Sequence, residues 1–319
     1  MSPPPSTQTP AEIVASANRS RALWLLFAES DPSHRVGQVA ATLATAQQGR
    51  LSLEGLLEAR RGDRIVGASW GQVSPGGTGL LWAAQLTPGE SESTALRLHE
   101  AIDRWFEQHD VCLAQASLPN KATPAEARLR ASGYRRIADV CYMAASLEDS
   151  RVTCGEDDFG DGDDERALQF EAYHAGNHQR LADVVEQTYR QTLDCPALDG
   201  LRAIDDVLIG HRHTGVFDSQ RWLIVRHEQR DIGCLLLADH PQENQWELVY
   251  MGIVPEARGK QHGLAVARQA QRLAARAGRE RLVLAVDAEN APALAMYQAA
   301  RFVAWDQRRV FLKVFRRAS

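Results

Sequence analysis

The sequence of 319 residues lacks the features of two large classes of protein. It has no apolar run of about 20 residues, which a helix needs to span a bilayer. Its net charge of −5 argues against a general nucleic-acid binder, which would usually be basic. Residues 1–10 carry neither the charged nor the apolar segment of a secretory signal, so we expect a short disordered tail there. These absences predict a cytoplasmic protein that binds neither membrane nor nucleic acid.

The sequence also lacks paired cysteines and a recognisable metal-binding spacing. Its five cysteines are scattered and contain no CxxC pair, which fits a reducing compartment without structural zinc. The acidic run 155–165 has no EF-hand spacing, and His211 with His213 is more typical of a solvated helix end than of a metal site. We therefore expect no metal. Cys195 is a candidate nucleophile, with a plain buried or loop thiol as the alternative.

The main positive feature of the sequence is an internal repeat. Leu98 and Val266 occupy the same place in two amphipathic helical patterns, and Gly133 and Arg301 follow at the same separation of 168 residues. A constant offset over several elements predicts two copies of one fold. In the first copy we expect helices within 11–50, two strands around Gly62-Asp63, and a helix over 92–109. The acidic run between the copies predicts a solvated linker over 151–166.

The turn from Val254 to Gly263 has the composition of a phosphate site. A β-type run ends before Pro255, a basic loop with Gly259 and Lys260 follows, and a long Ala/Arg helix comes next. The first amides of a helix have no internal partners and attract anions, and glycine lets a ligand approach the backbone. The loop lacks the glycine patterns of nucleotide-triphosphate and dinucleotide sites.

This loop resembles the pyrophosphate loop of the GNAT superfamily of acyl-CoA N-acyltransferases, whose pattern is [QR]-x-x-G-x-[GA]. Arg258 and Gly263 match its ends, whereas Gln261 stands where the middle glycine is expected. Downstream, Asn290 and Tyr297 match the closing signature of the superfamily, which ends in a Gly-Phe pair. Phe302 matches that pair, and Arg301 replaces its glycine.

The resemblance implies two tandem α/β (α+β) domains, each a mixed β-sheet flanked by helices. It implies acetyl-CoA as co-substrate and a primary amine of a small molecule as acceptor, joined in a ternary complex. The cofactor-binding residues carried over are Ile253, Val254, Arg258, Gly259, Lys260, Gln261, His262, Gly263 and Asn290. Tyr297 is implied as the proton donor to the departing thiolate, and packing within its helix is the alternative.

Glu247 is our candidate for the base, because it lies on the strand whose far end meets the cofactor. A solvent-facing glutamate at a strand start is an equal alternative. The acceptor pocket implied by the fold includes Tyr189, Asp194, Cys195 and Asp199, whose carboxylates would suit a cationic amine. Helix caps and solvated faces would explain the same residues.

The two copies differ where chemistry is expected. Glu90 and Glu92 stand in the first copy where the second has Arg258 and Lys260, and carboxylates there would repel a pyrophosphate. Ala122 and Leu129 replace Asn290 and Tyr297. We therefore predict a degenerate domain over 11–150 and a catalytic domain over 167–319, in a monomer or homodimer.

Two alternative functions remain open. A non-catalytic acyl-CoA-binding or regulatory protein is favoured by Gln261 and Arg301 and opposed by Tyr297, Asn290 and the basic loop. Nucleic-acid binding through 308–317 is the weaker alternative, since that segment alternates as an ordinary terminal strand does.

Overall fold

The computed structural model describes residues 11–15, 17–28, 31–121, 123–147 and 168–315. The predictions of a disordered tail over 1–10 and a linker over 151–166, and the comparison that uses Ala122, lie outside these residues. The chain forms two compact units, which we call the first unit (1–136 and 310–319) and the second unit (137–309). Within the described residues, no helix is long and apolar enough to cross a membrane.

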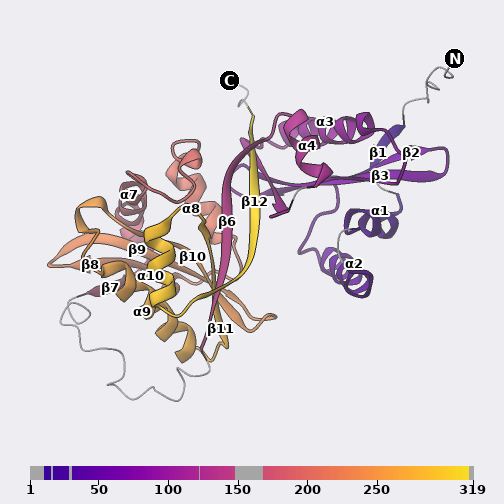
Figure 1. Ribbon diagram of the computed structural model, residues 1–319. Helices are drawn as coiled ribbons and strands as arrows, with labels where there is room; N and C mark the ends of the chain where they lie inside the picture. Colours follow the sequence, from indigo (N-terminus) through magenta and orange to yellow (C-terminus); the bar gives the residue numbers. More distant parts are fainter. Residues whose placement is uncertain (1–10, 16, 29–30, 122, 148–167, 316–319) are drawn as a thin grey trace. The chain divides into compact units, whose positions relative to one another are not determined.

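The first unit is a sheet in the order β1-β2-β3-β4-β5-β12, covered by helices on both faces. Its elements are β1 (Glu12–Ala15), α1 (Arg19–Leu26), α2 (Pro32–Gln47), β2 (Leu56–Arg61), β3 (Arg64–Ser74), β4 (Thr78–Leu86), α3 (Glu92–Gln108), β5 (Leu113–Pro119), α4 (Pro124–Ala131) and the end of β12 (Val303–Val314). Helices α3 and α4 lie on one face, and α1 and α2 lie on the other (Figure 1). The core between α3 and the sheet is built from side chains such as Ile102 and Phe106.

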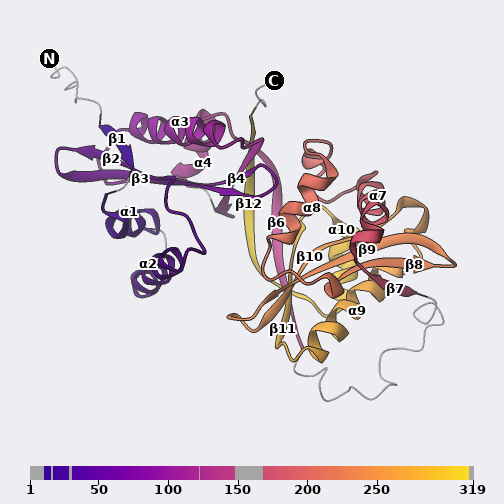
Figure 2. The ribbon, with the colours of Figure 1, turned by 180° about the vertical axis from the view of Figure 1, so that it is seen from behind.

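The second unit repeats this plan in the order β12-β6-β11-β10-β9-β8-β7. Its elements are β6 (Arg135–Ser146), β7 (Gln169–Ala172), α7 (His178–Tyr189), α8 (Ile204–Arg212), β8 (Trp222–His227), β9 (Arg230–His240), β10 (Gln245–Ile253), α9 (His262–Arg276), β11 (Arg281–Asp287), α10 (Ala291–Ala299) and the start of β12. Four short 3-10 turns join them: η1 (Ala175–Asn177), η2 (Pro196–Leu198), η3 (Ser219–Arg221) and η4 (Pro255–Ala257). Helices α7 and α9 lie on opposite faces of the sheet (Figure 2).

The offset predicted from the sequence reappears in the elements. Leu113 and Arg281 begin β5 and β11, and Arg135 and Val303 begin β6 and β12, each pair 168 residues apart. The strand order of the second unit along the chain, with two helices after β7 and one after β10, is the order implied by the GNAT resemblance. The fold class predicted from the sequence is therefore confirmed.

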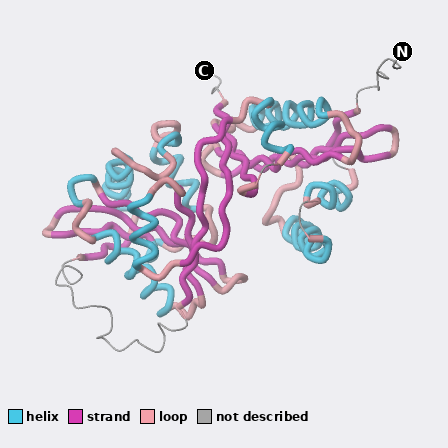
Figure 3. The backbone as a smooth tube through the Cα atoms, in the orientation of Figure 1, coloured by secondary structure: helices cyan, strands magenta, loops and turns pink. Residues whose placement is uncertain are grey.

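The last strand of each repeat is not confined to its own half of the chain. Strands β6 and β12 are neighbours (Figure 3), and only the start of β6 belongs to the first unit. The end of β12 returns to the first unit, where Phe311 and Phe315 join the core and Lys313 pairs with Asp103 at 2.6 Å. The domain boundaries predicted from the sequence stay a prediction, while the compact units place 137–146 with the second half.

One local prediction is wrong. Helical periodicity was expected throughout 11–50, but Glu12–Ala15 forms β1, which pairs antiparallel with β2 between Ala15 and Leu57. Two β-branched residues, Ile13 and Val14, favour the extended conformation there. The hairpin around Gly62-Asp63 and the helix after Ser91 are confirmed.

Candidate active site

A cavity of about 570 Å³ opens in the second unit between β10, α7, α9 and α10. It is lined by both backbone and side chains of β10 and by the loop that precedes α9. Of the residues predicted for the site, those that line it are Asp194, Ile253, Arg258, Gly259, Gln261, His262, Gly263, Asn290 and Tyr297. The cavity therefore brings together most of the predicted cofactor loop and the predicted proton donor.

The cavity exists because two parallel strands part. β10 pairs with β11 from Gln245 to Leu248, and an irregularity in its register with β9 follows between Leu248 and Tyr250. Beyond this point β10 continues beside β9 alone. A bulge next to a diverging strand re-aims the backbone and leaves one edge of β10 available to a ligand.

The free edge of β10 is formed by Met251 and Ile253. The N–H of Val254 donates to the carbonyl of Ile232 on β9 at 2.9 Å. Since antiparallel pairs alternate, Met251 and Ile253 direct their backbone groups to the opposite edge. The N–H of Val254 is used within the sheet and its side chain is buried in the core, so this N–H is not left for a ligand, and Val254 as a cofactor contact stays a prediction. Met251 was missed, because the sequence does not show where a strand bulges.

The amino end of α9 faces the cavity without a side-chain cap. Gln261 is its N-cap, at φ 59° and ψ 4°, and makes no capping hydrogen bond. This is the left-handed conformation that favours the glycine of the family pattern, and Gln261 adopts it at a cost of about 1 kcal/mol. Gly259 has a φ of 77°, and a Cβ on Gly263 would meet only Met296, at 3.9 Å. Lys260 is exposed beside this turn and does not line the cavity.

Arg258 is placed differently from the prediction. Its guanidinium donates to the carbonyl of Ile253 at 2.9 Å and to three carbonyls at the end of α7. These acceptors are Thr188 at 2.8 Å, Arg190 at 3.0 Å and Gln191 at 3.0 Å. The side chain therefore ties the loop to the carboxyl end of α7, where a cation is stabilised by the helix dipole, instead of pointing its charge at a ligand.

The approach of α7 to β10 is very close. A Cβ on Gly252 would lie 2.6 Å from Cβ and Oγ1 of Thr188, so no other residue fits there. The hydroxyl of Thr188 lies 2.7 Å from that of Tyr250 and donates to the carbonyl of Val185 at 2.6 Å. This packing fixes one wall of the cavity.

The segment after α7 crosses from β10 to the end of β11. The backbone N–H of Asp287 donates to Oδ1 of Asp194 at 2.8 Å, and the N–H of Cys195 donates to Oδ2 of Asp287 at 3.1 Å. Cys195 reaches this arrangement at a φ of 45°. Burial raises the pKa of the Asp194 carboxyl. The N–H of Asp287, which donates to this carboxyl, lowers its pKa, whereas the negative charge of Asp287 raises it.

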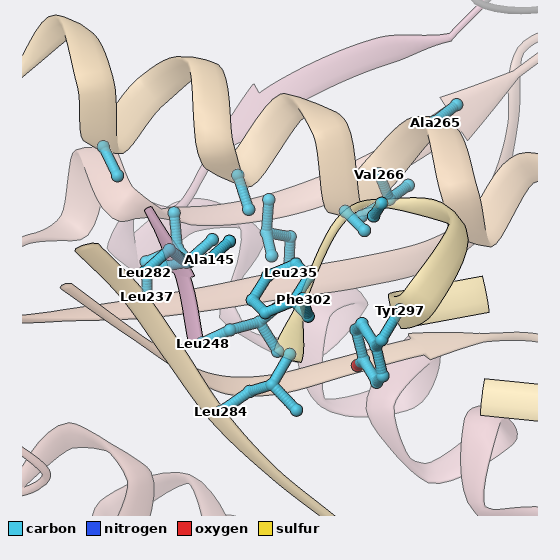
Figure 4. Close-up of a cluster of buried hydrophobic side chains, with 14 of the residues drawn as sticks. Ala145, Leu235, Leu237, Leu248, Ala265, Val266, Leu282, Leu284, Tyr297 and Phe302 are labelled. Atoms are coloured by element: carbon cyan, nitrogen blue, oxygen red, sulfur yellow. The ribbon is translucent and has the colours of Figure 1, made fainter. Parts of the chain in front are cut away.

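Tyr297 lies on α10 with its ring against Phe302, at a centroid distance of 5.5 Å (Figure 4). The side chain is 6% exposed and belongs to the core cluster, yet it also lines the cavity. Burial raises the pKa of its hydroxyl, and the charge of Asp194 raises it further. The group is therefore protonated at neutral pH, as a proton donor must be. Asn290 caps the same helix, accepting the N–H of Ala293 at 3.3 Å.

Glu247 is not among the residues that line the cavity. Its carboxylate lies 2.8 Å from Nε2 of His240, and this contact raises the pKa of His240. The structure therefore does not bring Glu247 together with Tyr297. The sequence showed strand alternation, but it could not show that His240 stands on the neighbouring strand beside Glu247.

The geometry does not favour Cys195 as a nucleophile, nor His211 and His213 as metal ligands. Burial, followed by the charges of Asp194 and Asp287, raises the pKa of the Cys195 thiol to about 12, so it is a thiol and not a thiolate at neutral pH. His211 stacks on Tyr250 and His213 bonds the carbonyl of Ile209. Among the residues that the structure describes, no group of three or more His, Cys, Asp or Glu is arranged to hold a metal.

Comparison with known protein families finds one match, which lies in the second half of the chain. Residues 186–302 match the model of the acetyltransferase (GNAT) family. No curated protein matches the chain. This chain is similar in fold to a GCN5-related N-acetyltransferase from Sphaerobacter thermophilus, with a TM-score of 0.61 at 15% identity over 92% of this chain and 91% of that one.

Two further solved structures show the same fold. A fungal multi-domain protein with a GCN5-related glucosamine N-acetyltransferase region has a TM-score of 0.60 at 15% identity, over 96% of this chain and 38% of that one. A tandem GNAT protein from the clavulanic acid biosynthesis pathway has a TM-score of 0.50 at 15% identity, over 97% and 99%. The fold is thus a tandem GNAT fold, and residues 186–302 within it are similar to the acetyltransferase (GNAT) family.

Proposed function

We propose that the second unit is an N-acetyltransferase that transfers the acetyl group of acetyl-CoA to the primary amine of a small molecule in a ternary complex. The observation that carries the proposal is that one cavity joins the uncapped start of α9, the free edge of β10 and the Tyr297 side chain. The matches to acetyltransferases support the reaction class.

The residues present fit acetyl-CoA. The amides at the start of α9 and the turn at Gly259 and Gly263 would hold the pyrophosphate, with Lys260 adding positive potential. The backbone groups of Met251 and the N–H of Ile253, whose carbonyl accepts from Arg258, would pair with the amides of the pantetheine arm. The bound co-substrate supplies an activated acetyl thioester.

The chain's own groups have three tasks. A backbone N–H on the free edge of β10 can donate to the oxygen of the thioester carbonyl, which is where negative charge develops during acyl transfer. The Tyr297 hydroxyl holds a proton for the departing sulfur. The acceptor must lose a proton, since an alkyl ammonium has a pKa of about 10. Glu247, which does not line the cavity, remains our proposal for this step, acting directly or through water.

Titration calorimetry with acetyl-CoA, followed by a thiol-release assay over a panel of primary amines, tests the proposal. One binding site per chain and amine-dependent release of CoA are expected. Binding without turnover for any amine would favour a non-catalytic acyl-CoA-binding protein, and no binding would exclude both. Sedimentation velocity in the same buffer would distinguish the proposed monomer from a homodimer.

A further inference from the structure

We infer that Asp194 receives the ammonium group of the acceptor, so that the second unit selects small cationic amines over neutral molecules of the same shape. The inference rests on the proposed function, because it names the acceptor class of that site.

The first argument is the fixed position of Asp194. The segment that carries it is held at one end by Arg258, which binds the Thr188, Arg190 and Gln191 carbonyls. At the other end it is held by the paired bonds between Asp194, Cys195 and Asp287. A carboxylate held from both sides is preorganised for a ligand and loses little side-chain entropy on binding.

The second argument is the position of this carboxylate in the cavity. Asp194 lines the cavity together with Tyr297, and its charge acts on the Tyr297 hydroxyl. Tyr297 is the group proposed to meet the sulfur. An acceptor nitrogen bound at Asp194 would therefore lie on the side of the cavity where the thioester reacts.

The third argument is charge. The groups that act on the Asp194 carboxyl are the Asp287 N–H and the Asp287 carboxylate, and no described lysine, arginine or histidine is among them. A partly buried carboxylate without a cation carries a desolvation cost, and a ligand cation would offset that cost. The acceptor ammonium is the cation that the proposed reaction supplies.

Three other carboxylates considered for the site do not combine a fixed position, a place in the cavity lining and the absence of a cation. The Asp287 oxygens accept the N–H groups of Cys195 and Glu289. Glu247 is paired with His240 outside the cavity lining. Asp199 is on the same connection but is exposed and does not line the cavity. Asp199 is therefore a matched control.

The test compares the binding of two pairs of probes to the full chain saturated with CoA. Phenethylamine is compared with phenethyl alcohol, and n-butylamine with n-butanol, at pH 7.5, where both amines are protonated. Affinities are measured by ligand-observed NMR titration for the wild type, Asp194→Asn, Asp194→Ser and Asp199→Asn. Asparagine keeps an oxygen for the Asp287 N–H, and the thermal midpoint of each variant reports on folding.

We expect the wild type and Asp199→Asn to bind each amine at least tenfold more tightly than its alcohol. This preference should fall below about twofold in both Asp194 variants, while acetyl-CoA affinity stays within threefold of the wild type. A retained ammonium preference in Asp194→Asn, equal binding of amine and alcohol to the wild type, or no amine binding would each overturn the inference. Failure of the wild type to bind acetyl-CoA would instead overturn the proposed function.

Discussion

The two units place different groups at equivalent strand edges. In the second unit, Met251 leaves its backbone edge toward the cavity. In the first unit, the N–H of Thr87 donates to the carbonyl of Val66 as that of Val254 does to Ile232, so Ala84 corresponds to Met251, each three residues before the donor. The N–H of Ala84 donates to Nε2 of His99 at 2.9 Å, and its carbonyl accepts from Arg128 at 3.0 Å. The first unit thus satisfies with its own side chains the groups that the second leaves for a ligand.

The helix starts differ in the same way. Ser91 caps α3 by accepting the N–H of Ser93, and Glu92 binds Arg128 with contacts of 2.6 and 2.8 Å. Glu90 is bound by Arg61, and this contact lowers the pKa of Glu90 to about 2. The comparison teaches that one repeat can occupy with its own side chains the strand edge and helix start that the other repeat leaves open, while the fold around them stays the same.

Exchanging Tyr297 for Phe should have the largest effect. Loss of the hydroxyl proton donor should lower kcat about 100-fold, while acetyl-CoA affinity stays within threefold. Steady-state kinetics and calorimetry check both values. The first unit supplies the control, because Leu129 is the buried residue at the equivalent place, and Leu129→Met should leave kcat unchanged. An undiminished rate in Tyr297→Phe would remove this residue from the mechanism.

Arg258→Ala should have the next largest effect. It removes the bonds to four carbonyls that hold the cofactor loop on α7, so acetyl-CoA affinity should fall at least tenfold, and the thermal midpoint should fall as well. Lys260→Ala should change affinity about threefold or less, and this difference should vanish at high salt. Equal and salt-sensitive losses in both variants would mean that Arg258 acts as a phosphate charge.

Acid should reduce the stability that the first unit gains from His99 and Glu90, the side chains at its strand edge and helix start. Burial, followed by the charges of Arg128 and Lys313, lowers the pKa of His99 to about 4, so the unfolded chain binds more protons between about pH 6.5 and 4. Stability from His99 is therefore lost as pH falls through this window, and that from Glu90 is lost below about 4.5. The thermal midpoint should drop less between pH 7 and 5 in His99→Gln than in the wild type. An identical drop would count against this assignment.

The smallest effects concern one turn present in both units. Gly133 and Arg301 follow equivalent helices with φ of 86° and 63°. Because only glycine adopts this conformation without strain, Arg301→Gly should stabilise the second unit by about 1 kcal/mol, and Gly133→Ala should destabilise the first by a similar amount. Urea denaturation measures both. Changes of the same sign would show that side-chain contacts outweigh backbone strain.

Local patterns in the sequence predicted much of the fold. The periodicity of α3, the turn signal at Gly62-Asp63 and the constant offset are properties of neighbouring residues or of spacing. The strand β1 was missed because its pairing with β2 is made by residues far apart in the chain. A four-residue segment carries too little periodicity to distinguish helix from strand.

The site was predictable as a set of residues and not as a set of contacts. The turn at Gly259 and the place of Tyr297 followed from the resemblance. The carbonyl partners of Arg258, the pairing of Glu247 with His240 and the sheet bond of Val254 depend on residues brought together by folding. The filled edge of the first unit was missed because His99 and Arg128 belong to different helices.

The route of β12 affects the order in which the protein can be completed during translation. Phe311, Lys313 and Phe315 supply the last side chains of the first unit's core, although its other elements end near Arg136. A ribosome needs roughly 10 to 35 seconds to make residues 137–309 at the usual rate. The unit that is synthesised first therefore has an incomplete core until residues 310–315 have been made, and a stop codon before Val310 would leave it incomplete.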